Sequence, residues 1–169
     1  IYGTKVIFED IKKQNFEDIL VVSPDVGGVV RSRALSKFLE VGELAIIDKR
    51  RDEANKSEVM NVIGDVSNKD CLLYDDMADT CGTLCNAADA LKANNAKSVS
   101  AYITHPVLSG DAIKKINESS LDQLVVTDTI PLSEEAKSCK KIRCISLAPT
   151  LAEAIKRLNK EESISEMLM

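Results

Sequence analysis

The sequence predicts an α/β fold in which a mostly parallel sheet carries helices on both faces, and three observations support this prediction. Short apolar runs of strand length alternate with segments whose apolar residues recur every three or four positions. Most apolar runs are continuous, which is typical of parallel strands covered on both faces. The length, 169 residues, suffices for one full core. We therefore expect a single domain over residues 1–169.

The expected elements follow this alternation along the chain. Six apolar runs predict strands: Ile19–Ser23, Leu44–Ile47, Cys71–Tyr74, Val99–Thr104, Leu124–Thr127 and Arg143–Leu147. Helical spacing predicts five helices: Thr4–Lys13, Val29–Glu40, Leu84–Ala93, Ala112–Glu118 and Leu151–Leu158. The one exception to the alternation lies between Leu44 and Tyr74, where a polar stretch and no convincing helix separates two strands.

Composition excludes several classes of protein. The net charge of -5, the aromatic content of 4% and the lack of Trp argue against a general nucleic-acid binder. No apolar run approaches the roughly 20 residues that span a membrane, and no signal peptide is visible. The five cysteines form no C-x-x-C pair and there is one histidine, so a zinc site is not expected. These features predict a cytoplasmic protein whose cysteines are small buried hydrophobes.

The segment after the third predicted strand is the strongest candidate for a ligand site. Asp75 and Asp76 are followed by Asp79-Thr80-Cys81-Gly82-Thr83 and then by a helix. A turn of small residues that leads into a helix N-terminus supplies free backbone N–H groups and a favourable dipole for a phosphate. The two carboxylates can accept hydrogen bonds from sugar hydroxyls or contact a metal that the substrate carries. In the alternative interpretation, in which the segment binds no ligand, Asp79 or Thr80 is a simple N-cap and the acid pair lies in a solvated turn.

Two further strand ends carry residues that suit a phosphate-rich site. Asp25 follows the first strand in Pro24-Asp25-Val26-Gly27-Gly28, where it can coordinate Mg²⁺ or merely cap its turn; spacing leaves both open. Lys49, Arg50 and Arg51 follow the second strand, and the polar stretch after them favours a mobile lid that brings charge onto a substrate. His105 is expected to have a structural or interface role. The chain has neither a P-loop nor a G-x-G-x-x-G motif.

With these segments in view, the chain resembles the C-terminal half of the ribose-phosphate diphosphokinase family, also called phosphoribosyl pyrophosphate synthetases, in its bacterial form. The resemblance runs from about Tyr2 to Ser165. The segments that carry it, in order, are VVSPDVGGVVRSRA, AIIDKRRDEAN, NVIGDV, DDMADTCGTLC, YITHPVLSG, VVTDTIP and LAEAIKRL followed by EESIS.

The resemblance implies a phosphoribosyltransferase type I fold with about five parallel strands. It implies transfer of a diphosphate group from MgATP to the C1 hydroxyl of ribose 5-phosphate, which gives phosphoribosyl pyrophosphate and AMP. By motif, the 5-phosphate is held by Asp79, Thr80, Cys81, Gly82 and Thr83, and the ribose hydroxyls and nearby Mg²⁺ by Asp75 and Asp76. Asp25 then is a metal ligand, Lys49 the catalytic cation and Arg51 a second cation on the substrate. Cys81 departs from the Gly that most bacterial members have.

The resemblance also implies parts that this sequence lacks. Family members carry an N-terminal domain of similar size that supplies most ATP contacts, so the 169 residues alone are expected to be inactive. They form hexamers, regulated by ADP and phosphate at a site to which Ser163 and Ser165 would contribute. Two other readings stay open: a phosphoribosyltransferase that consumes phosphoribosyl pyrophosphate, and a non-catalytic regulatory paralogue.

Overall fold

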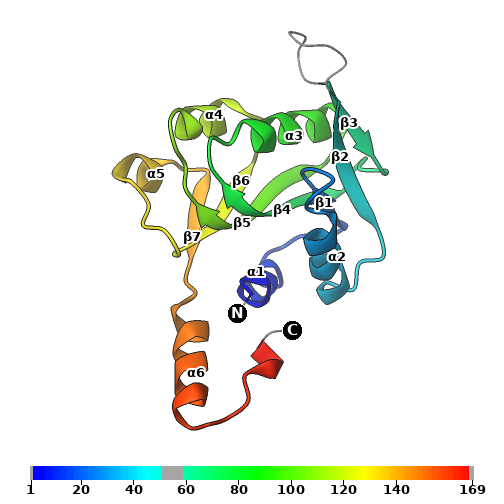
Figure 1. Cartoon of the computed structure of the whole chain (residues 1–169). Helices are drawn as coiled ribbons and strands as arrows, with labels where there is room; N and C mark the ends of the chain where they lie inside the picture. The colour runs from blue at the N-terminus through cyan, green and yellow to red at the C-terminus, as the bar shows by residue number, and fades with distance from the viewer. Residues whose placement is uncertain (1, 51–58, 168–169) are drawn as a thin grey trace.

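A seven-stranded sheet forms the centre of the computed structural model, which describes residues 2–50 and 59–167. The strand order is β3-β2-β1-β4-β5-β6-β7 (Figure 1). All neighbours are parallel except β2 and β3, which are antiparallel. The strands are β1 (Ile19–Ser23), β2 (Leu44–Arg50), β3 (Val59–Ile63), β4 (Asp70–Ala78), β5 (Ser98–Pro106), β6 (Gln123–Thr127) and β7 (Ile142–Ile145). The predicted α/β class is confirmed.

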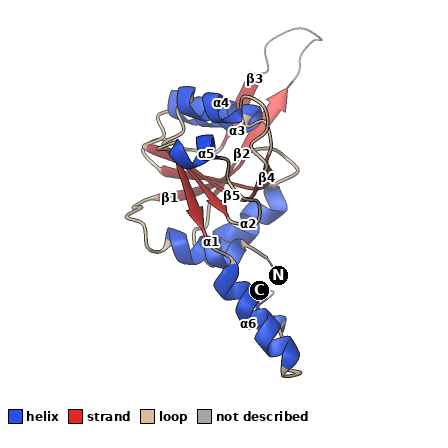
Figure 2. Ribbon diagram, turned by 90° about the vertical axis from the view of Figure 1, so that its left-hand side faces the viewer, coloured by secondary structure: helices blue, strands red, loops and turns tan. Residues whose placement is uncertain are grey.

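Helices cover both faces of the sheet, as the sequence predicted. α1 (Thr4–Ile11) and α2 (Val29–Phe38) lie on one face, and α3 (Gly82–Ala93), α4 (Ala112–Glu118) and α5 (Glu134–Ser138) on the other (Figure 1). α6 (Ala148–Asn159) extends away from the sheet (Figure 2), and the chain then turns back toward α1 as far as the short 3₁₀ turn Ser165–Met167 (Figure 1). Among the described residues, no helix combines the length and the apolar character that crossing a bilayer requires.

The continuous apolar runs are explained by burial on both faces of the central strands. In β1, Leu20 and Val22 pack in the core under α3 and α4, while Val21 between them packs in the core under α1 and α2. Leu72 and Leu73 in β4 divide in the same way. Successive side chains of a strand point to opposite faces, so a strand with two covered faces needs apolar residues at every position.

Three elements were not predicted: β3, α5 and the 3₁₀ turn Ser165–Met167. The described sheet has six mutually parallel strands and the antiparallel β3, against the expected number of about five parallel strands. β3 follows the polar stretch and lies at the sheet edge, where Ile63 remains 49% exposed. An edge strand has one neighbour and partial exposure, so its sequence signal is weak. α5 has five residues and begins at an N-cap, Ser133, whose hydroxyl accepts from Ala136 N at 3.1 Å. Helices this short give too few turns for a periodic pattern.

Two strands extend further than predicted, which moves several candidate residues. β4 continues to Ala78, so Asp75 and Asp76 lie inside the strand and not in the turn that follows it. β2 continues to Arg50, so the backbone of Lys49 belongs to the strand and pairs with Met60 of β3. The expectation that these cations follow the strand end was therefore wrong for Lys49 and Arg50. Arg51 and the rest of the expected lid lie outside the described residues.

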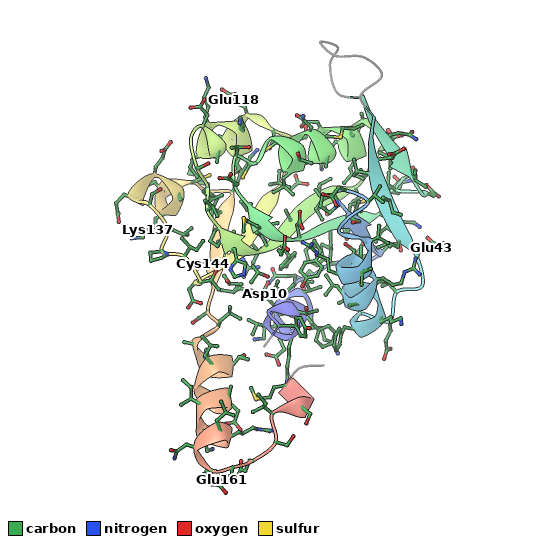
Figure 3. The ribbon with its side chains drawn as sticks, in the orientation of Figure 1. Asp10, Glu43, Glu118, Lys137, Cys144 and Glu161 are labelled. Atoms are coloured by element: carbon green, nitrogen blue, oxygen red, sulfur yellow. The ribbon has the colours of Figure 1, made fainter. Side chains whose placement is uncertain are left out.

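Side-chain hydrogen bonds connect α1 to strands β5 and β7 of the sheet. Asp10 on α1 accepts two hydrogen bonds from Arg143 of β7, at 2.7 and 2.6 Å, and one from the Tyr102 hydroxyl at 3.1 Å. Figure 3 shows Asp10 at the side of α1 that faces the sheet. Burial opposes ionisation of Asp10, but the hydrogen bonds and charge of Arg143 outweigh it and lower the carboxyl pKa. The paired charge is thus favoured in the folded chain.

Asp10→Asn should lower the free energy of unfolding at pH 7 by about 1–3 kcal/mol, because it leaves Arg143 without its anion. The folded-state pKa of Asp10 is depressed, so its contribution is present above the unfolded value of about 4 and is lost as pH falls through the folded value. Urea unfolding from pH 7 to pH 3 measures both effects. Glu9→Gln, one position away and exposed, is the control. Equal stability of Asp10→Asn and the parent at pH 7 would contradict the assignment.

Candidate phosphate and sugar site

A pocket of about 210 Å³ opens at the carboxyl ends of β1 and β4. Its lining includes seven of the residues that the sequence singled out: Asp25, Asp75, Asp79, Thr80, Cys81, Gly82 and Thr83. They come from two crossovers of the parallel sheet, one between β1 and α2 and one between β4 and α3. The carboxyl edge of such a sheet is where α/β proteins bind their ligands.

The link between β4 and α3 is a turn of only three residues, Asp79–Cys81. Cys81 is the N-cap residue, with φ 58° and ψ 6° in the left-handed region. Because Cys81 holds the N-cap position, the interpretation of Asp79 or Thr80 as a simple N-cap was wrong. The Cys81 side chain makes no capping hydrogen bond. Within the described part of the chain, the backbone N–H groups of residues 80–83 donate to no other group. Free N–H donors at a helix N-terminus are groups that can bind an anion.

The thiol of Cys81 takes no part in the charge balance of this turn. Burial is the main cause that raises the pKa of Cys81 to about 12, and the neighbouring Cys85 and Asp79 act in the same direction. The thiol is therefore protonated at neutral pH. Its side chain is buried in the core under α3. Cys81 thus fills space below the turn, and it also contributes to the lining of the pocket.

One arginine pairs with both carboxylates of the acid pair in β4. Arg31, on α2, forms ion pairs with the carboxylates of both Asp75 and Asp76. Asp75 is the more buried, with 23% of its side chain exposed against 61% for Asp76. Burial raises the pKa of Asp75 to about 6. Burial also disfavours the charged form of Asp76, but the hydrogen bond and charge of Arg31 prevail and lower its pKa.

Asp25 is shaped by its own turn and also faces the pocket. Its carboxylate Oδ1 accepts from Gly28 N at 2.7 Å, and its carbonyl accepts from the Ser23 hydroxyl at 2.6 Å. A Cβ atom at Gly28 would lie 2.8 Å from the Ser23 Oγ, so the turn requires glycine there. The turn-capping interpretation is therefore confirmed. The described residues contain no group of three or more His, Cys, Asp or Glu side chains arranged around a metal.

The loop after β5 and helix α4 hold the turn Asp79–Cys81 in place. The backbone N–H groups of Leu108 and Ser109 donate to the carbonyls of Ala78 and Asp79, at 3.0 and 3.1 Å. The Ser109 hydroxyl donates to the Asp79 carboxylate, and Lys115 Nζ on α4 donates to the Thr80 carbonyl at 3.1 Å.

Sequence reasoning missed these supports, and it missed Arg31 as well. Arg31 stands in the quoted segment VVRSRA, yet nothing in its spacing points to Asp75.

The remaining candidate residues are placed by the structure only in part. Lys49 is placed by its backbone in β2, and Arg51 lies outside the described residues. Ser163 and Ser165 follow α6 and contact each other, with Ser165 N donating to Ser163 Oγ at 3.2 Å. The regulatory role predicted for these serines stays a prediction. His105 Nδ1 lies 3.1 Å from Thr129 Oγ1, a contact between β5 and the segment after β6 that fits its expected structural role.

A mostly parallel sheet with helices on both faces, with an acid pair in the last half of its central strand and a short turn into a helix after that strand, is typical of the phosphoribosyltransferase fold. A purine phosphoribosyltransferase from Pyrococcus horikoshii Ot3 shares this fold, with a TM-score of 0.55 and 19% identity over 73% of this chain and 79% of that one. The chain belongs to the family of phosphoribosyl synthetase-associated domains, whose sequence model matches residues 11–169.

Close relatives support this assignment and the resemblance seen in the sequence. The structure is similar to phosphoribosylpyrophosphate synthetase from Mycobacterium smegmatis, with a TM-score of 0.85 and 34% identity over 94% of this chain and 51% of that one. A ribose-phosphate pyrophosphokinase of Marinomonas sp. is 57% identical over 99% of this chain and 53% of its own length. The chain therefore spans about half the length of the relatives it matches.

A proton should bind the acid pair near pH 6 in the ligand-free chain, mainly at the buried Asp75. The folded-state pKa of Asp75 is raised above its unfolded value of about 4, so folding favours the protonated form. The free energy of unfolding should consequently fall as pH rises from about 4 to about 6, and Asp75→Asn should remove that decline. Carbon-13 NMR of the carboxyl groups follows the titration, and urea unfolding follows stability. Glu161→Gln is the control, and a titration of Asp75 near pH 4 would refute the assignment.

Proposed function

We propose that this chain is the half of a ribose-phosphate diphosphokinase that binds ribose 5-phosphate. One observation carries the proposal: the pocket places four unpaired backbone N–H groups of residues 80–83 beside the carboxylates of Asp75 and Asp25. A sugar phosphate has the matching chemistry, with an anionic end for the N–H groups and hydroxyls for the carboxylates. The relatives named ribose-phosphate pyrophosphokinase support the choice of this sugar phosphate.

The turn Asp79–Cys81 and the first residues of α3 form the phosphate half of the proposed site. The N–H groups of Thr80, Cys81, Gly82 and Thr83 bind the 5-phosphate, assisted by the threonine hydroxyls and the dipole of the twelve-residue helix. Asp79 shapes the turn through its bond from Ser109. Asp75 and Asp76 accept hydrogen bonds from the ribose hydroxyls.

The carboxylates also fit a magnesium ion that arrives with the substrates. Mg²⁺ in phosphoryl-transfer sites is usually held by one or two carboxylates together with substrate oxygens, not by a cage of protein ligands. Asp25 at the β1 end and Asp75 at the β4 end both line the pocket and would hold it. When bound, the ion neutralises charge on the transferring phosphates. The protein's own part is to orient the sugar and to keep its hydroxyls beside Asp75.

The reaction we propose joins the C1 hydroxyl of ribose 5-phosphate to the diphosphate group of ATP, giving phosphoribosyl pyrophosphate and AMP. Phosphoryl transfer of this type depends on alignment and electrostatic stabilisation more than on a protein nucleophile. In the proposal, Lys49 is the cation that meets the developing charge, and Arg51 is a second cation on the substrate. Formation of AMP would separate this function from that of an enzyme that consumes phosphoribosyl pyrophosphate, and from a non-catalytic paralogue.

The rest of the proposed enzyme lies in the half of the relatives' length that this chain does not span. That half supplies most ATP contacts. Apolar side chains exposed on α2 and α6 suit packing against it: Val30, Phe38, Leu151, Ile155 and Leu158. We further propose that the complete protein is a cytoplasmic hexamer, with ADP and phosphate as effectors that act near Ser163 and Ser165.

Thr83→Val should weaken the binding of ribose 5-phosphate by roughly tenfold, the cost of one hydrogen bond to a charged group. Calorimetry on the 169-residue chain measures the affinity, with ribose as the ligand that lacks the phosphate. Thr150→Val is the matched control, since Thr150 lies in the first turn of a different helix, α6. Equal affinities for ribose and ribose 5-phosphate in the parent chain would contradict the proposed function.

Lys49→Ala should lower kcat by at least about a hundredfold while the affinity for ribose 5-phosphate changes little, because its charge is needed mainly in the transition state. The measurement requires both halves, for example this chain joined to the N-terminal half of the Marinomonas relative, with AMP release followed in time. Lys37→Ala, an exposed lysine on α2, is the control. A variant with a normal kcat and only a raised KM would rule out a catalytic role.

A further inference from the structure

The peptide bond between Thr80 and Cys81 lies in the turn Asp79–Cys81, and its carbonyl accepts a hydrogen bond from a lysine side chain. Four consecutive carbonyls, those of residues 78–81, each accept a hydrogen bond. Ala78, Asp79 and Cys81 accept from the backbone N–H groups of Leu108, Ser109 and Cys85. The Thr80 carbonyl accepts from the ammonium group of Lys115, at 3.1 Å. The Asp79 carbonyl also accepts from the Cys81 thiol at 3.8 Å, so among these four carbonyls that of Thr80 is held by a charged side chain in place of a backbone N–H group.

The orientation of the Thr80 carbonyl is coupled to the backbone conformation of Cys81. Cys81 has φ 58°, a conformation that costs an L-residue about 1–2 kcal/mol and that glycine adopts freely. Rotation of the Thr80–Cys81 peptide by half a turn would bring φ of Cys81 into the ordinary negative range and relieve this strain. The same rotation would reverse the Cys81 N–H, because C=O and N–H of a trans peptide point in opposite directions. The N–H would then leave the pocket.

We propose that Lys115 is a positioning residue, which holds the Thr80–Cys81 peptide so that the Cys81 N–H faces the bound phosphate. The hydrogen bond draws the carbonyl toward α4, on the side away from the ligand, and stabilises the left-handed conformation of Cys81. Backbone N–H groups hold the carbonyls of Ala78 and Asp79 and so fix the preceding peptides, whereas the Thr80 carbonyl is held by the ammonium group of Lys115. The identity of the ligand rests on the proposed function, whereas the hold on the peptide does not.

Lys115→Met retains most of the side-chain stem and removes the donor. It should weaken ribose 5-phosphate binding by about tenfold, as expected when the strained conformation must be restored at each binding event. The loss should shrink to about twofold in a Cys81→Gly background, because glycine needs no hold at positive φ. It should stay near tenfold in a Cys81→Ala background, which removes the thiol but keeps an L-residue. Lys114→Met, the exposed neighbour on α4, is the control for charge.

Calorimetry and NMR on the purified chain test the proposal, and circular dichroism checks that each variant is folded. Calorimetry gives the affinity of each variant for ribose 5-phosphate. If Lys115→Met lowers the affinity equally in the Cys81 and Cys81→Gly backgrounds, Lys115 acts only through its charge, and the proposal is overturned. In the ligand-free chain, the NMR coupling between HN and Hα of residue 81 reports φ directly. A change of this coupling in Lys115→Met supports the hold on the peptide, and an unchanged coupling overturns it. This second readout applies even if ribose 5-phosphate fails to bind, an outcome that would instead defeat the proposed function.

Discussion

The three-residue turn between β4 and α3 is the constraint on which the rest of the site depends. β4 is fixed by β1 on one side and by β5 on the other, with β5 in register as far as Ala78 and Pro106. The helix begins at Gly82, so the chain must change direction within residues 79–81. So short a turn leaves Cys81 in the left-handed region and the following N–H groups without acceptors. The free N–H groups that we propose bind the phosphate are thus a direct product of where the strand ends and the helix starts.

The carboxylates beside the turn are partly compensated by a positive charge within the protein. Asp75 and Asp76 lie on one strand within reach of a single guanidinium group, that of Arg31, so neither carboxylate faces solvent as an isolated charge. The arrangement still costs stability, because burial keeps the pKa of Asp75 well above its ordinary value. Such a cost is common where side chains are arranged for a ligand and not for folding. A sugar hydroxyl or a divalent cation that approaches Asp75 has to compete with Arg31.

The features that the sequence predicted are those with a local pattern. Buried strands such as Leu20–Val22 require apolar residues at every position, and the order acid pair, small turn and helix is contiguous from Asp75 to Thr83, so both can be read directly. The features it missed depend on distant pairing. β3 is stabilised mainly by its neighbour β2, Arg31 meets Asp75 across 44 positions, and Lys115 meets Thr80 across 35. No periodicity along the chain records contacts of that kind.

The placement of Lys49 shows how such pairing changes a functional argument. The sequence favoured a loop cation, free to approach a substrate, whereas its backbone is paired with Met60 in the antiparallel edge of the sheet. A residue in a paired strand is positioned by that strand, so the backbone of Lys49 follows the direction of β2 and the twist of the edge pair. Asp25 lies two residues after the end of β1, the strand beside β2. Pairing between neighbouring strands, which no local pattern in the sequence records, therefore sets the relative placement of these two backbone positions.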